Sequence, residues 1–141
     1  MAGRPERQPA VIVHSLTQAL DTAAAAVELD RPVTMLSASG AASAAGVGWW
    51  VALTEVVAER HPTARLRLVL DCADQAGVAL GALRRGIKVI GYDGPAEVAA
   101  KLAAVATAGG AEVVRPDFGQ ALDLAGETDP ATAIRRWLAQ R

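Results

Sequence analysis

The sequence predicts an α/β fold in which helices cover a parallel sheet. The first observation is a βαβ unit at residues 66–92, where a short apolar run, a helical segment and a second apolar run follow one another. The second is that this alternation recurs along the whole chain, which is typical of parallel sheets. The third is that 141 residues with a hydrophobic fraction of 52% suffice for one domain with a buried core.

Five short apolar runs predict the strands of the sheet. The run at 66–70 is almost continuously apolar, as expected for a strand that is buried on both faces. Lys88 and Glu112 make the fourth and fifth runs less apolar, which favours positions toward one edge of the sheet. The expected strands are residues 10–13, 33–36, 66–70, 87–92 and 111–114.

Capping signals predict the helices that separate these strands. Ser15 and Gln18 fit a capping box, and Asp74 is a good N-cap. Pro95 stands in a first turn, where proline is tolerated, and Gly86 suits a left-handed C-cap. The expected helices are residues 16–29, 41–60, 75–85, 95–108 and a last helix that Asp129 caps.

The remaining segments complete the predicted architecture. Residues 1–9 are expected to be a flexible lead-in, followed by one domain over residues 10–141. Residues 115–129 form a long irregular segment, in which 122–124 could add a short edge strand. With right-handed crossovers, five parallel strands give a three-layer α/β/α doubly wound sandwich. We expect the flavodoxin-like strand order 2-1-3-4-5, with the Rossmann-like order 3-2-1-4-5 as the alternative.

The bulk composition argues against several classes of function. The 14 Lys and Arg residues balance 15 Asp and Glu residues, and aromatic residues make up only 4%, so nucleic-acid binding has no basis. No apolar run reaches the roughly 18 residues that a membrane span needs. Cys72, the single cysteine, cannot form an internal disulfide, and residues 1–9 do not resemble a signal peptide. These features predict a cytoplasmic protein.

The distinctive polar residues follow the predicted strands. Ligands of doubly wound sheets bind at the carboxyl ends of the strands, so these positions are the candidates for a ligand site. Helix capping is the alternative for any single residue, because capping selects the same residue types at the same positions. The candidates are His14, Ser37, Ser39, Gly40, Asp71, Cys72, Asp74, Tyr92 and Arg115.

The best candidate loop is Ser37–Gly40. Its small side chains precede a helix, so backbone N–H groups could face an anion, with Arg115 as the one cationic side chain at the strand ends. Tight packing of the helix start on the sheet is the alternative. The loop matches neither the Walker motif nor GxGxxG, so nucleotide binding is unsupported and no cofactor is identified.

Other chemistry has weaker support. His14, a serine of the Ser37–Gly40 loop and Asp71 could form a catalytic triad, but the Gly-x-Ser-x-Gly elbow is absent, so no catalytic residue is assigned. Asp71 and Asp74 could bind Mg²⁺, but two carboxylates at this spacing do not predict a metal site. Cys72 is either a reactive thiol at a helix start or, more commonly, a small buried side chain.

Adjacent tryptophans suggest a surface for assembly. Trp49 and Trp50 lie about 100° apart on a helix, so they cannot both face the same core. Because tryptophan is enriched in interfaces, we expect a homo-oligomer, most simply a two-fold dimer. Trp137 fits the apolar stripe of the last helix and is expected in the core.

The sequence therefore leaves three functions open. The leading expectation is a small domain that binds a small polar or anionic ligand at the carboxyl edge of its sheet. The alternative is a non-catalytic interaction or assembly module that acts through its helix surfaces. The third is a small hydrolase.

Overall fold

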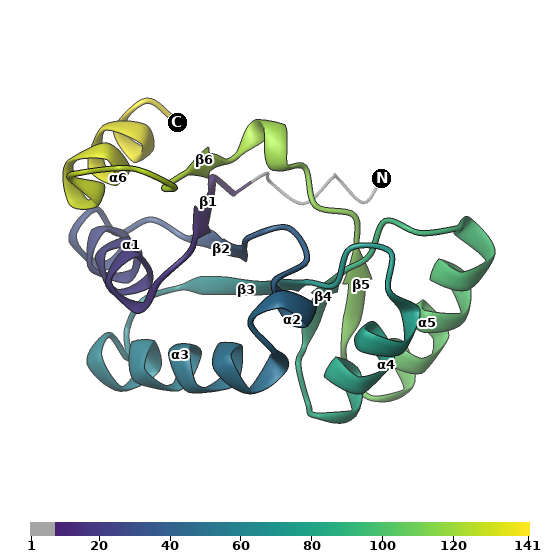
Figure 1. The fold of residues 1–141 in the computed structure, drawn as a ribbon. Helices are drawn as coiled ribbons and strands as arrows, with labels where there is room; N and C mark the ends of the chain where they lie inside the picture. Colours follow the sequence, from purple (N-terminus) through teal and green to yellow (C-terminus); the bar gives the residue numbers. More distant parts are fainter. Residues whose placement is uncertain (1–7) are drawn as a thin grey trace, which may run out of the picture.

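The computed structural model describes residues 8–141, which form a single parallel sheet with helices packed against it (Figure 1). The strands are β1 (Ala10–Val13), β2 (Val33–Ser37), β3 (Leu66–Asp71), β4 (Val89–Gly91), β5 (Glu112–Val114) and β6 (Leu122–Asp123). The helices are α1 (Leu16–Glu28), α2 (Ala41–Ala44), α3 (Val47–Arg60), α4 (Ala76–Arg84), α5 (Ala96–Ala108) and α6 (Pro130–Ala139), with a 3-10 helix η1 (Phe118–Gln120). Most of the expected lead-in, residues 1–7, lies outside the described residues.

The α/β class is confirmed, but the strand order differs from both expected orders. The order is β5-β4-β3-β2-β1-β6, with every neighbouring pair parallel. The 3-2-1 part of the Rossmann-like order is present, whereas β4 and β5 continue beyond β3 and not beyond β1. The order 2-1-3-4-5 is wrong, because β1 pairs with β2 and β6. Local patterns specify a strand but not its neighbour, which explains this correction.

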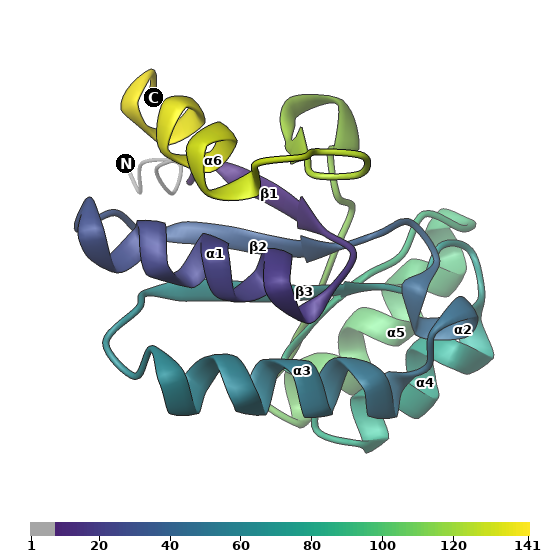
Figure 2. The same ribbon diagram turned by 60° about the vertical axis from the view of Figure 1, so that its left-hand side comes forward.

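The three layers are present in an asymmetric form. Side chains of one sheet face form the main core together with α1, α3, α4 and α5, and α6 packs beside α1. The other face carries a smaller apolar cluster of Ile12, Leu36, Val69 and Val89, against which Phe118 of η1 packs. Strands β1 to β5 follow one another across the sheet in one direction. With right-handed crossovers, all the helices that connect them lie on the same face of the sheet. Figure 2 shows α1 and α3 running alongside β2 and β3.

Three helix boundaries differ from those predicted. The expected helix 41–60 is two helices, because Gly46 breaks it with φ 96° and ψ 151°, a conformation that only glycine adopts without strain. Asp74 is not the N-cap of α4: Gln75 occupies that position, with no side-chain hydrogen bond. Pro95 is the N-cap residue of α5 and precedes its first turn.

Other local predictions are confirmed. Ser15 Oγ accepts a hydrogen bond from Gln18 N at 3.2 Å, and Asp129 Oδ1 accepts one from Thr132 N at 3.2 Å. Gly86 has the left-handed backbone with φ 86°. The short edge strand expected within 122–124 is β6, and β4 and β5 lie toward the opposite edge.

Within residues 8–141, no helix combines the length and the apolar character that crossing a membrane requires.

Candidate functional site

A hydrogen-bonded cluster surrounds Asp71 at the carboxyl end of β3. The side chain is 2% exposed, and its Oδ2 accepts hydrogen bonds from Gly40 N at 2.8 Å and Ala73 N at 3.1 Å. Ser37 Oγ at the end of β2 accepts a hydrogen bond from Asp71 N at 2.9 Å. The structure therefore brings Ser37, Gly40 and Asp71 together, as adjacent parallel strands require.

The Asp71 carboxylate fills the place where an external anion was expected. Gly40 N, the amide at the start of α2, already donates to this carboxylate. A Cβ added at Gly91 would clash with Asp71 Oδ1, so the neighbouring strand also closes over it. Burial raises the pKa of Asp71, and the nearby Asp93 raises it further, against the lowering effect of the two amide donors.

The strand-end cluster extends to the other sheet edge through backbone groups. Asp93 N donates to Ala73 O at 2.9 Å, and the exposed Arg115 donates through Nη2 to Asp93 O at 3.0 Å. Tyr92 is buried with 4% exposure. Ser39 and Asp74, in contrast, are exposed.

Cys72 is a buried side chain of the main core. It is 0% exposed, and burial, followed by the charge of Asp71, raises the pKa of its thiol to about 12. A thiolate is therefore strongly disfavoured, which supports the packing interpretation over the reactive one.

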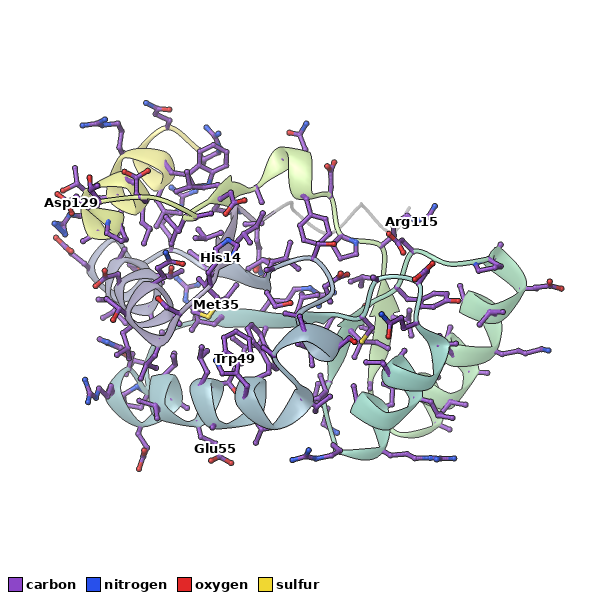
Figure 3. All side chains as sticks on the ribbon, viewed as in Figure 1. His14, Met35, Trp49, Glu55, Arg115 and Asp129 are labelled. Atoms are coloured by element: carbon purple, nitrogen blue, oxygen red, sulfur yellow. The ribbon has the colours of Figure 1, made fainter. Side chains whose placement is uncertain are left out.

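His14 belongs to a separate group at the β6 end of the sheet. Its Nε2 lies 2.6 Å from Asp123 Oδ1 in β6. Gln18 connects the segments after β1 and β6, because its side chain accepts a hydrogen bond from His14 N at 2.7 Å and donates one to Leu124 O at 3.0 Å. Strand β2 separates β1 from β3, and Figure 3 shows His14 well apart from Arg115. The described residues contain no hydrogen bond from His14 to a serine or to Asp71, so the expected triad is not assembled.

The sequence did not predict a groove on the sheet face opposite the main core. This open-face groove has a volume of about 560 Å³, and Leu36, Val69 and Val114 contribute apolar side chains to its lining. The segment after β5 supplies Pro116, Asp117 and Gln120 to one wall. The sequence does contain a signal for this mixed lining. In two strands a polar residue stands two positions before an apolar one, Thr34 before Leu36 and Arg67 before Val69. Because alternate side chains of a strand lie on the same face, each pair places a polar and an apolar side chain side by side.

Positive charge dominates the lining of the open-face groove. Among the described residues, the side chains of Arg31, Arg67 and Arg141 line it, against the one side-chain carboxylate of Asp117. Arg31 Nη1 donates to Leu138 O at 2.8 Å, and Arg67 Nη1 lies 2.7 Å from Glu112 Oε1. Each guanidinium has further N–H donors, because arginine carries five.

Trp137 also lines the open-face groove. Its ring packs against the main core, as expected, but it also lines the groove, and Arg141 lies 3.4 Å above the ring centroid. Its Nε1 is buried and has no hydrogen-bond partner among the described residues. A buried indole N–H usually finds an acceptor, and leaving it unpaired costs about 1–3 kcal/mol.

The remaining expectations concern metals and the tryptophan pair. Within residues 8–141, no three His, Cys, Asp or Glu side chains come together in a way that could hold a metal ion. Trp50 is buried with 1% exposure, whereas Trp49 is only partly buried, and their ring centroids lie 5.9 Å apart. Both rings nevertheless pack against the main core, Trp49 as the more exposed of the two, so the expectation that they cannot face the same core is wrong.

A comparison with protein-family models and with curated proteins found no match to this chain.

Proposed function

We propose that the protein binds a small anionic molecule with an apolar body in the open-face groove. The observation that carries this proposal is the combination of three guanidinium groups and one carboxylate around an apolar floor. The volume of about 560 Å³ falls within the range of about 300–1,000 Å³ that is usual for small-molecule sites.

The available interactions are large enough for useful affinity. Two hydrogen bonds between guanidinium groups and an anion contribute about 3–6 kcal/mol. Burying roughly 150 Å² of apolar ligand surface contributes about 4 kcal/mol more. Together they reach the roughly 8 kcal/mol of micromolar binding, before the cost of association is subtracted. The proposal keeps the ligand class that the sequence suggested and moves the site from the strand ends onto the sheet face.

The test uses 8-anilinonaphthalene-1-sulfonate, a fluorescent anion with an apolar body, as the first probe. Wild-type protein is expected to bind it, and octanoate is expected to displace it while octylammonium is not. Arg141→Gln should weaken binding about tenfold, equivalent to roughly 1.4 kcal/mol. Arg67→Gln should do the same, although it also removes the ion pair with Glu112.

The matched control is Arg135→Gln, which removes the same charge from α6 at a position outside the groove lining. This variant should bind the probe as wild type does. Equal affinities of all three variants and wild type, or equal displacement by octylammonium, would contradict an anion site in the groove.

Assembly through helix surfaces is the second candidate function. The observation that favours it is a set of large apolar side chains that are exposed on or beside helices: Leu16, Val27, Leu29 and Val105. Light scattering at high micromolar concentration discriminates the two candidates, because an assembly module should show at least a dimer mass. A monomer mass would contradict assembly and the expected Trp49 and Trp50 interface. A hydrolase is not proposed, since the hydrogen bonds of His14 lead to Asp123.

A further inference from the structure

The sheet opens between β3 and β4 toward the amino ends of these strands. Strand β3 spans Leu66–Asp71, but it pairs with β4 only at Leu70 and Asp71. On its other side it pairs with β2 from Leu66 onward. Within the described part of the chain, the amino-terminal half of β3 therefore has a strand neighbour on one side only.

Backbone groups of Leu66 and Leu68 point into this opening. Arg65 O accepts from Val33 N in β2, whereas Cys72 N donates to Gly91 O in β4. Because N–H and C=O groups of successive residues point to alternate sides of a strand, Leu66 and Leu68 direct theirs toward β4. No pairing of either residue with β4 exists among the described residues, so four backbone groups are free there.

A cavity occupies the opening and carries positive charge. It measures about 610 Å³, and it is lined by Trp50 and Ile87 on the apolar side and by Arg65, Arg67 and Lys88. Among residues 8–141, no acidic side chain lines it. Arg65 pairs with Asp30 and Arg67 with Glu112, which leaves Lys88 as the cation without an acidic partner among the described residues. Its Nζ donates one long hydrogen bond, of 3.5 Å, to Gly109 O and keeps two further N–H donors.

We propose that this slot binds an extended acidic peptide segment of a partner protein by strand addition. Backbone hydrogen bonds to Leu66 and Leu68 would hold the peptide, as in other cases where a strand joins an exposed sheet edge. Alternate residues of an extended peptide face opposite sides, so apolar side chains turn toward Trp50 and acidic ones toward Arg67 and Lys88. Lys88, the cation of the slot without an acidic partner among the described residues, favours an acidic partner.

The probe is a synthetic hexapeptide of alternating valine and glutamate with blocked ends. Binding should slow hydrogen exchange at the amides of Leu66 and Leu68 by at least about tenfold, because these N–H groups become hydrogen-bonded. The same peptide methylated at every backbone nitrogen should not bind, and neither should a valine–lysine peptide. Lys88→Glu should weaken binding by about tenfold or more.

Lys101→Glu on α5 is the matched control, since it makes the same charge change outside the slot and should leave binding unchanged. Arg141→Gln should also bind the peptide normally, which separates this test from the test of the open-face groove. The proposal is overturned if the peptide binds without protecting Leu66 and Leu68, if the methylated peptide binds equally well, or if no binding occurs at millimolar peptide. Protection of both amides in the free protein would also overturn it, because the slot would then be filled by its own chain or by a second copy.

Discussion

Asp71 is a carboxylate that the fold removes from water and solvates with its own backbone. Two amides donate to Oδ2, yet burial dominates and raises the pKa of this side chain. That Asp71 lies close to Ser37 was predictable, because the carboxyl ends of adjacent parallel strands lie at the same edge of the sheet. Its role was not, since nothing in the sequence distinguishes a carboxylate that binds Gly40 internally from one that faces a ligand.

The raised pKa of Asp71 predicts a specific dependence of stability on pH. Between the unfolded pKa of 3.8 and the higher folded value, the native state holds more protons than the unfolded state. The free energy of unfolding therefore falls as pH rises through this window. Urea unfolding from pH 3.5 to 8 should show wild type losing stability relative to Asp71→Asn as pH rises, with a plateau above the folded pKa.

Carboxylates with a lowered pKa change stability with pH in the opposite direction, but their contributions cancel when wild type is compared with Asp71→Asn. The pKa of Glu112 is lowered by its bond to Arg67, so that pair loses stability as pH falls, equally in both proteins. A stability difference between wild type and Asp71→Asn that stays constant, or that grows in favour of wild type as pH rises, would contradict the assigned direction.

Gly91 is required by the close approach of two neighbouring segments. A Cβ at this position would clash with Asp71 Oδ1 and lie 2.6 Å from Pro116 Cγ. Gly91→Ala should therefore lower the free energy of unfolding by about 1–3 kcal/mol, the usual cost of overpacking. Gly81→Ala in α4 is the control, because an added Cβ would meet no atom within 4 Å beyond its chain neighbours and its own helix backbone, and it should raise stability by about 0.5–1 kcal/mol. Chemical denaturation measures both, and an unchanged Gly91→Ala variant would refute the clash.

The helix between β2 and β3 shows how one backbone conformation divides a predicted element. Small residues and two glycines suggested close packing but not a break, and the helix ends and restarts around Gly46. A capping residue predicts the start of a helix correctly where its side chain accepts a hydrogen bond from a backbone N–H in the first turn of that helix, as at Ser15 and Asp129. Asp74 failed as a prediction because the preceding residue, Ala73, adopts a left-handed backbone with φ 51° and the helix starts later.

Gly46 and Gly48 provide a direct test of that break. Gly46→Ala should cost about 1–3 kcal/mol, because φ 96° with ψ 151° strains any residue with a Cβ even though the space is free. Gly48→Ala lies inside α3 and should stabilise by about 0.5–1 kcal/mol. Urea midpoints compare the two variants, and a Gly46→Ala protein as stable as wild type would mean that α2 and α3 can join.

The arrangement of the complete chain explains what sequence patterns could and could not predict. Alternating apolar runs and capped helices specify parallel βα units, so the fold class and nearly every strand were predictable. The order of the strands depends on contacts between units, which no local pattern records, and the groove lining depends on that order. The separation of His14 from Asp71 and the location of the open-face groove therefore required the structure.

The position of β1 between β2 and β6 has a consequence for the chain during its synthesis. Its partner β2 is complete at residue 37, but β6, which covers its other edge, ends only at residue 123. At roughly 5–20 residues per second, translation leaves this edge uncovered for roughly 4–17 s. Unpaired strand edges are templates for association, so nascent chains on one messenger are exposed to one another during that interval. Two residues of β6, paired with Val11 and Ile12, end that exposure.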